Sequence, residues 1–435
     1  MRKIIKASCF AVAVMAPAVF AQWGGNNGGF GGQQSGNDKM EYSEKFADVN
    51  YAGDSKGYHN LDIYLPKESK DSYPVVIHTY GSAWSMNNYK GSADLNTICA
   101  ALLKAGYAVV TPNHRSASDA IYPAQLHDLK AVLRFVRGNA EKYKFDTSFV
   151  AMSGFSSGGH LSSLVATTCG MTEGKSGSVT VDLVGTVGEF TSFGTCIDAL
   201  SMWSAPTDIY LMNPIKNFMG SGTYEGAFIG AEREGNKDKW NVASSPYYVS
   251  DDDPPVILFH GTSDKTVNIE QSEEMYDSLQ RHGVESEFVR VSGGDHGSAN
   301  MYTDETLGKM VAFFDKAREA KAAAVLPPPD TTCCKDTSVT DTSVVGDSVP
   351  PVVGDSLTRI MVSQASLAPV RLQGNRIFAG TATEYGFAVV SVDGTRAWHG
   401  TFRGSLDLSR IPSGVYAVVV KSPSGAQKSL KFLKK

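Results

Sequence analysis

The sequence predicts an α/β fold with a doubly wound, mostly parallel sheet, followed by a small all-β domain. Over about 280 residues, short apolar runs typical of strands alternate with helical patterns, enough for one large domain. Within this region the Gly-containing segment Gly154–Gly158 joins an apolar run directly to a helical stretch. After residue 325 the composition changes to Pro, Asp, Thr and Ser, and then to alternating strand patterns. These three observations indicate two folded parts joined by a linker.

The segment Gly154–Gly158 reads Gly-Phe-Ser-Ser-Gly and lies between the apolar run Phe149–Met152 and the small-residue stretch Gly159–Thr168. A serine at a sharp strand-to-helix turn needs small neighbours, because the helix begins immediately against the strand. The pattern therefore predicts a nucleophile elbow with Ser156 at its tip. The chain contains 43 glycines, so an ordinary loop is the alternative interpretation of the pentapeptide taken alone.

Two downstream features favour the elbow. The strand-like run Val256–Phe259 is followed by Asp264, and the strand-like run Phe288–Val291 is followed by His296 on a glycine-flanked loop. The chain order Ser, Asp, His is the order used by α/β-hydrolases and differs from those of chymotrypsin and subtilisin.

The chemistry assigns a role to each of the three side chains. A serine hydroxyl is a weak nucleophile at neutral pH and needs a base, for which histidine is suited, while a carboxylate fixes the histidine tautomer. We expect Ser156 to be the nucleophile, His296 the general base and then acid, and Asp264 the orienting acid. Asp295, adjacent to His296, is the alternative acid. Ser157 is the alternative nucleophile, although its backbone N–H is better suited to be one oxyanion donor.

A second oxyanion donor is expected after the strand-like run Tyr73–Tyr80. The segment Tyr80–Trp84, Tyr-Gly-Ser-Ala-Trp, resembles the His-Gly-Gly-Gly-Trp oxyanion segment of esterases and lipases. This resemblance implies the N–H of Ser82 as the donor, with Ala83 as the second choice. Because a Cβ atom disfavours positive φ, we expect ordinary backbone dihedrals at both residues.

Residues from about Val49 to Lys316 resemble the α/β-hydrolase esterases that include bacterial feruloyl and acetylxylan esterases. The resemblance rests mainly on the elbow, Asp264 and the His296 loop. It implies an α/β-hydrolase fold and a serine carboxylic ester hydrolase that removes acetyl or feruloyl groups from plant cell-wall polysaccharide such as xylan.

The acyl pocket and the class of reaction leave alternatives open. Trp84, Phe155 and Trp203 are candidates for apolar walls of a substrate pocket. The alternatives to an esterase are a serine peptidase of the prolyl-oligopeptidase type and a non-catalytic binding protein with a relic site.

The remaining histidines have structural interpretations. His127 and Asp128 are expected to be fixed at a helix start, His160 to bond within the fold, and His78 to lie in a buried strand. His, Cys, Asp and Glu show no metal-binding spacing, and no phosphate-binding loop with its lysine is present. We therefore expect no metal, no cofactor and no nucleic-acid partner.

The N-terminus has the pattern of a signal peptide. Residues 1–21 combine a basic start with an apolar core and a Val-Phe-Ala cleavage pattern, and the apolar stretch is too short for a confident membrane span. We expect a protein that is secreted or at the cell surface, with no membrane span after signal removal. Residues 22–38, rich in Gly, Asn and Gln, are predicted to be a flexible tract, and residues 39–325 the catalytic domain.

The cysteines suit an oxidising compartment. Cys9 would be lost with the signal peptide, which leaves five cysteines. Cys169 and Cys196 flank an insertion and are the expected disulfide. Cys99 is expected to be a buried free thiol, and a bridge between the neighbours Cys333 and Cys334 would be strained.

The C-terminal part differs in pattern and charge. Residues 326–356 are a predicted linker, and residues 357–435 carry eleven Lys and Arg against three acidic residues, a formal +8 within a chain of net charge −5. Turns at Asp393–Gly394 and Ser424–Gly425 predict a small β-sandwich. Segments such as Pro412–Tyr416 resemble type IX secretion sorting domains, which implies a secretion-machinery partner. An accessory β-domain and a basic surface-attachment or carbohydrate-binding module are the alternatives.

Overall fold

A computed structural model describes residues 40–91, 94–218, 220–325 and the strand segments of the C-terminal region, which are 371–373, 376–378, 385–391, 396–403, 405–408, 411, 414–421 and 427–434. The chain divides into two compact units between Lys321 and Ala322. The predicted signal peptide, glycine-rich tract and linker, with Cys9, Cys333 and Cys334, lie outside the described residues. The domain boundaries therefore stay predictions.

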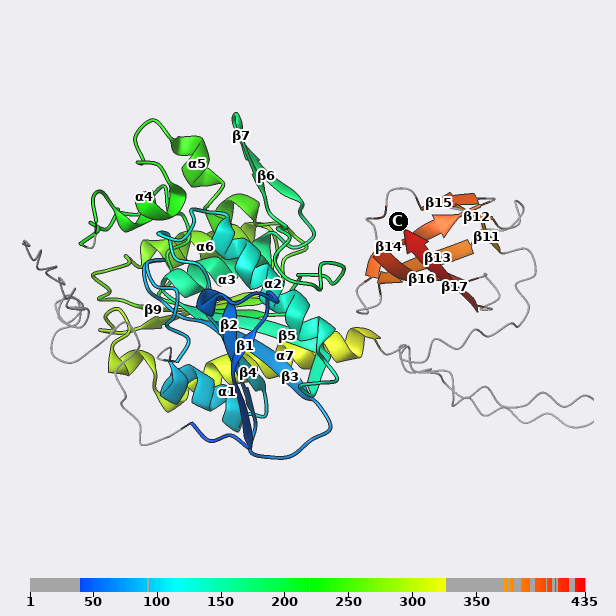
Figure 1. The fold of residues 1–435 in the computed structure, drawn as a ribbon, viewed down its shortest axis with the longest axis horizontal. Helices are drawn as coiled ribbons and strands as arrows, with labels where there is room; N and C mark the ends of the chain where they lie inside the picture. Colours follow the sequence, from blue (N-terminus) through cyan, green and yellow to red (C-terminus); the bar gives the residue numbers. More distant parts are fainter. Residues whose placement is uncertain are drawn as a thin grey trace, which may run out of the picture. The chain divides into compact units, whose positions relative to one another are not determined.

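The first unit is built on an eight-stranded sheet with the order β1-β2-β4-β3-β5-β8-β9-β10. Figure 1 shows this sheet among the helices of the first unit. The strands β1, β2 and β4 pair antiparallel, and the pairs from β4 through β3, β5, β8 and β9 to β10 are parallel. This bears out the predicted doubly wound, mostly parallel sheet. The strand bounds are β1 Glu44–Asn50, β2 Asn60–Leu65, β3 Tyr73–Thr79, β4 Ala108–Pro112, β5 Phe145–Phe155, β8 Leu200–Trp203, β9 Val256–Gly261 and β10 Ser286–Val291.

Helices cover both faces of this sheet because its strands are apolar on both faces, as buried parallel strands are. In β3, Val75 and Ile77 face one core and Val76 faces the other. The first core is closed by α2 (Ala124–Gly138), α3 (Ser157–Thr167) and α6 (Glu270–Arg281), and the second by α1 (Ala100–Lys104) and α7 (Asp304–Val325). The carboxyl ends of the parallel strands are thus left for the loops that carry the site.

An insertion follows α3, and it bears the predicted disulfide. Cys169 and Cys196 are bonded and enclose the hairpin β6 (Glu173–Ser176) and β7 (Val179–Asp182), which projects from the first unit in Figure 1. Cys99 is buried, as expected. The shorter helices are η2 Gly57–His59, η3 Leu95–Cys99, α4 Tyr224–Ile229, α5 Lys237–Asn241, η4 Ser245–Tyr248 and η5 Ala299–Met301.

Beyond the end of α7, the described residues of the second unit form β-sheets, as predicted for the C-terminal part. This unit contains a three-stranded sheet, β11-β12-β15, and a four-stranded sheet, β14-β13-β16-β17, around apolar side chains such as Ile377, Val389 and Val418. The antiparallel pairs β13/β14 and β16/β17 flank the two predicted turns, which themselves lie outside the described residues. The bounds are β11 Arg371–Gln373, β12 Arg376–Phe378, β13 Tyr385–Ser391, β14 Arg396–Phe402, β15 Ser405–Asp407, β16 Gly414–Lys421 and β17 Gln427–Lys434.

In the part of the chain that the structure describes, no helix has both the length and the apolar character needed to cross a bilayer.

Candidate active site

Ser156 occupies the sharp turn between β5 and α3, as the elbow pattern predicts. Its backbone has φ 52° and ψ −127°, a conformation that residues other than glycine rarely adopt. A Cβ atom at Gly154 would lie 2.4 Å from the Gly158 carbonyl oxygen, and one at Gly158 would lie 2.1 Å from the Thr79 carbonyl oxygen. Both flanking glycines are therefore required for the helix to begin against the strand.

The structure brings Ser156, His296 and Asp264 together. The Nε2 atom of His296 lies 3.0 Å from the Ser156 Oγ atom, and its Nδ1 atom lies 2.8 Å from the Asp264 Oδ2 atom. A carboxylate only accepts hydrogen bonds, so Nδ1 carries a proton and Nε2 of the neutral ring is left to accept the serine proton. This is the geometry in which histidine acts as the base for serine.

Asp264 is held as an anion at the base of this chain of contacts. Its Oδ1 atom accepts the backbone N–H groups of Thr266 and Val267, each at 2.9 Å. Burial alone would raise the pKa of the carboxyl, but His296 and the neighbouring His260 outweigh burial and hold the pKa well below its usual range. The group is therefore ionised at any pH at which histidine titrates.

Asp295, the alternative acid, has a different task. Its Oδ1 atom accepts the backbone N–H groups of Lys265 and of His296 itself, at 3.0 and 2.9 Å. These bonds tie the histidine loop to the loop that carries Asp264. The carboxylate braces the backbone, and the contact to the histidine ring is made by Asp264.

The two predicted oxyanion donors lie side by side. The N–H of Ser82 donates to the Ser157 Oγ atom at 2.9 Å, a contact between residues 75 positions apart in the chain. The N–H of Ser157 belongs to the first turn of α3, where backbone N–H groups have no partner within the helix. The segment after β3 therefore meets the helix start where a developing oxyanion would be stabilised.

The expectation of ordinary dihedrals in this segment is wrong at Ala83. Ala83 and Trp84 have φ of 50° and 54°. They are the central residues of a turn closed by the Ser85 N–H, which donates to the Ser82 carbonyl at 3.0 Å. The turn is held in place because the Trp84 ring is buried and the Trp84 carbonyl accepts the N–H of Ala117 at 2.7 Å. Tertiary packing thus overrides the steric preference of the side chains.

Gly81 is a residue whose role the sequence analysis missed. A Cβ atom at this position would lie 2.7 Å from the Ser156 Cβ atom and 2.9 Å from the Phe155 carbonyl oxygen. The glycine lets the segment after β3 press against the elbow.

The predicted substrate contacts need correction. Trp203 has no exposed surface and stacks on Phe259 with ring centroids 3.9 Å apart, within the core closed by α1 and α7. The prediction of a pocket wall is therefore wrong for Trp203. Trp84 and Phe155 are 1% and 2% exposed, so they are not open walls in this structure either. All three aromatic side chains pack in the hydrophobic cores.

The rings of Trp84 and Phe155 pack against residues around the site. The Trp84 Nε1 atom donates to the His160 Nδ1 atom at 3.2 Å, and its ring stacks on Phe228. The Phe155 ring lies 4.9 Å from the His296 ring. His160 in turn contacts the Ala243 carbonyl through Nε2, so its predicted structural role is confirmed.

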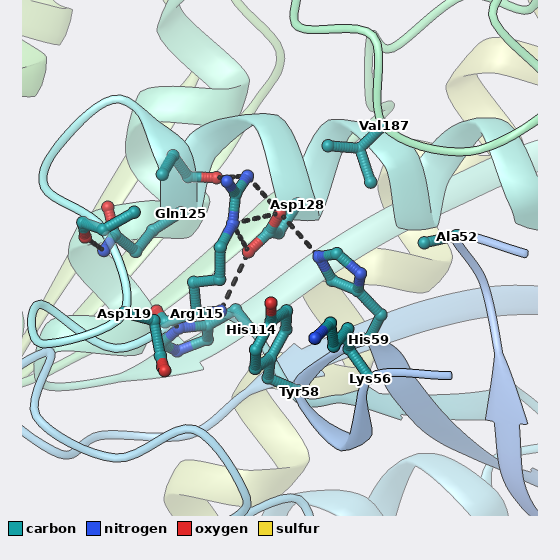
Figure 2. A network of polar contacts seen from close by, with 12 residues as sticks. Ala52, Lys56, Tyr58, His59, His114, Arg115, Asp119, Gln125, Asp128 and Val187 are labelled. Atoms are coloured by element: carbon teal, nitrogen blue, oxygen red, sulfur yellow. Dashed lines mark hydrogen bonds and ion pairs between the residues drawn. The ribbon is translucent and has the colours of Figure 1, made fainter. Parts of the chain in front are cut away.

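A buried ionic network fixes the loop after β4 (Figure 2). Arg115 donates from Nε and Nη2 to the Asp128 carboxylate at distances from 2.6 to 3.1 Å, and His59 Nε2 approaches the same carboxylate at 3.3 Å. His59 Nδ1 also lies 2.8 Å from Asp54. Burial alone would lower the pKa of His59, but Asp128 and Asp54 outweigh it and raise the pKa. Asp128 is thus structural, as predicted, and the network joins η2, the loop after β4 and α2.

The other histidines also have structural partners. His78 lies in the core with its Nε2 atom 3.0 Å from Asp94, and His127 Nε2 contacts the Asp182 carbonyl at 2.8 Å. Both agree with the sequence interpretation. His260, which no pattern singled out, is fully buried beside Asp264. The sequence feature that could have identified His260 is its position four residues before Asp264, near the end of a buried strand.

The arrangement suits nucleophilic attack by Ser156 on an acyl carbonyl, with proton transfer through His296. Among the described residues, no group of three or more His, Cys, Asp and Glu side chains is placed to hold a metal ion.

Known proteins with similar sequences are esterases. The chain is 26% identical over 236 residues to the probable carboxylic ester hydrolase LipM of Mycobacterium tuberculosis, a match that covers 54% of this chain and 51% of LipM. It is 26% identical over 267 residues to the isoprenylcysteine alpha-carbonyl methylesterase ICME of Arabidopsis thaliana, covering 59% of this chain and 58% of ICME. The chain thus spans about half the length of the curated relatives it matches.

Two solved structures are more similar. One is a truncated form of a carbohydrate esterase from gut microbiota, 39% identical with a TM-score of 0.61, which covers 66% of this chain and 99% of that chain. The other is a bifunctional GH43-CE protein of Bacteroides eggerthii, 42% identical with a TM-score of 0.60, covering 63% of this chain and 35% of that chain. Residues 61–279, half of the sequence, match the BD-FAE family and include Ser156 and Asp264. On these grounds the chain belongs to the BD-FAE family.

Proposed function

We propose that the protein is a secreted carboxylic ester hydrolase that removes acetyl or feruloyl groups from plant cell-wall polysaccharide such as xylan. The observation that carries the proposal is the chain of contacts from Ser156 through His296 to Asp264, at 3.0 and 2.8 Å. The similarity to a carbohydrate esterase from gut microbiota supports a carbohydrate ester as the substrate. The curated relatives, which are esterases, support an ester bond over a peptide bond.

The reaction would proceed through an acyl-enzyme. Ser156 Oγ attacks the acyl carbonyl carbon while His296 Nε2 takes the serine proton, and the negative charge moves to the carbonyl oxygen. Backbone N–H groups at Ser157 and in the segment Ser82–Ala83 stabilise this oxyanion. Protonated His296 then gives its proton to the leaving sugar oxygen, and the Ser156 ester forms as the original ester bond breaks. Water, deprotonated by His296, releases the acid and restores the serine.

The size of the acyl group is the finer part of the proposal. The three aromatic side chains expected to line a feruloyl pocket are buried in the core. A feruloyl group depends on contacts with aromatic pocket walls, which these three residues do not provide. An acetyl group is small and depends on few such contacts. We therefore expect acetyl esters to be the better substrates.

The test is a substrate panel with the purified full-length protein. Acetylated xylan, methyl ferulate, p-nitrophenyl acetate and a chromogenic peptide are each incubated with wild type and with Ser156→Ala. Release of acetate or ferulate by wild type and its loss in the variant is the expected result. Cleavage of the peptide alone, or no turnover of any ester, would remove the proposal.

Secretion and sorting by the C-terminal unit are part of the same proposal. They rest on the signal-like N-terminus and on the basic composition of residues 357–435. The full-length gene and one truncated near Pro328 are expressed in a host with type IX secretion, and extracellular esterase is measured. We expect export of the full-length product only. Equal export of both products, with a mature chain that still ends at Lys435, would favour an accessory module.

A further inference from the structure

His260 is a second, buried histidine beside the carboxylate of Asp264. It lies near the end of β9, four residues before Asp264, and has no exposed surface. Its Nε2 atom lies 2.8 Å from the Val267 carbonyl oxygen and 3.4 Å from the Asp264 Oδ2 atom. Because a carbonyl oxygen only accepts, Nε2 carries a hydrogen, which it donates to the Val267 carbonyl oxygen, and the Asp264 carboxylate lies next to this N–H.

The other edge of the ring is also held. His260 Nδ1 lies 2.7 Å from the Ser272 Oγ atom on α6. The ring therefore links α6 to the turn 264–267, in which the Thr266 and Val267 N–H groups bind the Asp264 Oδ1 atom. Both ring nitrogens of this histidine are used, and one of the partners, Val267, also donates its N–H to the Asp264 carboxylate.

The Asp264 Oδ2 atom is consequently shared. It accepts the His296 Nδ1–H at 2.8 Å and faces the His260 Nε2–H at 3.4 Å. The positive ends of two N–H dipoles therefore act on the same oxygen, and the negative charge that one of them stabilises is less available to the other. The weaker contact from His260 therefore moderates how strongly Asp264 stabilises protonated His296.

We propose that His260 is a positioning residue for the esterase reaction, which orients the Asp264 carboxylate and limits its stabilisation of the His296 imidazolium. The proposal rests on the proposed function, since it concerns the same triad. It extends the chain of contacts from Ser156, His296 and Asp264 to His260, whose ring is held by Ser272.

The other charged groups near this chain do not substitute for His260. Asp295 and Lys265 face the histidine loop from the outside, with 45% and 84% of their side chains exposed. Glu270, at the start of α6, acts on His260 from a distance. The pKa of the buried Tyr302 is raised mainly by burial, and the negative charge of Asp264 contributes to the increase. None of these groups is changed in the variants below.

The central variant is His260→Leu, which removes both nitrogens at similar volume. We expect kcat on p-nitrophenyl acetate to fall by about 10-fold to 100-fold, less than the roughly 10⁴-fold typical of losing the triad acid, with KM little changed. We expect the acid limb of the kcat/KM profile to move upward by about half a pH unit, because Asp264 then gives its full charge to protonated His296.

Two further variants separate positioning from folding. His260→Gln keeps an amide N–H₂ near the Nε2 position and should recover most of the turnover and the wild-type acid limb. Ser272→Ala leaves Nε2–H in place and should keep the wild-type limb, with a smaller loss of kcat. Thermal unfolding of each variant reports the structural part of the effect.

Three results would overturn the proposal. His260→Leu with wild-type kcat, a lowered kcat with an unmoved acid limb, or a Gln variant as impaired as the Leu variant would each leave His260 with only a packing role. If His260→Leu does not fold, His260→Asn, whose amide is too short to reach Val267, takes its place with the same readouts. An inactive wild type would instead remove the proposed function.

Discussion

The backbone N–H of Ser82 donates to the side-chain oxygen of Ser157 at 2.9 Å, so a proposed oxyanion donor is already engaged in the resting protein. Both residues are 1% exposed, and the bond therefore satisfies a buried N–H. During the reaction, an acyl oxygen that arrives between the Ser157 and Ser82 N–H groups must compete with this hydroxyl.

The first prediction is the effect of Ser157→Ala. The buried Ser82 N–H loses its partner, so the free energy of unfolding should fall by about 1–3 kcal/mol. Turnover should stay within about 10-fold of wild type, because the backbone N–H groups that face the oxyanion remain. Denaturant unfolding and p-nitrophenyl acetate kinetics measure the two effects. A loss as large as that of Ser156→Ala would identify the Ser157 hydroxyl as part of the chemistry.

The second prediction concerns Ser156 and His296 together. Either residue changed to alanine should lower kcat by about 10⁴-fold or more, and the double variant should lose no further factor, since the groups act as one unit. Single-variant and double-variant kinetics on one preparation check this. Multiplying losses would show that one residue has a separate role.

The third prediction compares two acids. Asp264→Asn should lower kcat by about 10⁴-fold, since the amide favours the wrong histidine tautomer. Asp295→Asn should cost far less, because the amide oxygen can still accept the N–H groups of Lys265 and His296. Circular dichroism on both variants verifies folding. The reverse order of activities would transfer the catalytic role to Asp295.

The fourth prediction is a pH-dependent contribution of His59 to stability. The pKa of His59 is raised in the folded protein from an ordinary value of 6.5, so its stabilisation is fully present below that value. It is lost as the pH rises through the higher folded-state pKa. The stability difference between wild type and His59→Gln should therefore shrink from pH 6 to alkaline pH. Denaturant unfolding across this range measures it, and a difference that grows with pH would contradict the assignment.

The fifth prediction tests the strained turn at Ala83. Glycine adopts a φ of 50° without steric cost, so Ala83→Gly should raise the free energy of unfolding by up to about 1 kcal/mol. Ala117→Gly, in the neighbouring loop and without positive φ, is the control and should lower it. Denaturant midpoints of the two variants give the comparison. A destabilised Ala83→Gly would mean that the alanine methyl contributes more packing than the strain costs.

Much of the fold and the triad residues could be predicted because each depends on local sequence. The elbow is marked by two glycines close to its serine in the sequence, and the acid and base follow recognisable strands. The positive φ of Ala83 could not be predicted, since it is imposed by the burial of Trp84 and a bond from Ala117. The misassignment of Trp203 has a similar cause, because a large apolar ring suits a pocket wall and a core equally well, and only the position of Phe259 decides. The role of His260 was not predicted, because it depends on the contacts of its ring with Asp264, Val267 and Ser272.

The triad joins residues that are far apart in the chain: Ser156 and His296 are separated by 140 positions, and His296 and Asp264 by 32. Their loops follow β5, β9 and β10, so the serine and histidine meet only after β8 and β9 have docked between β5 and β10. Such long-range pairing is slow compared with helix formation. During refolding, ester hydrolysis should therefore recover more slowly than the helical signal in circular dichroism. The rate at which hydrolysis returns would then report when the sheet is complete.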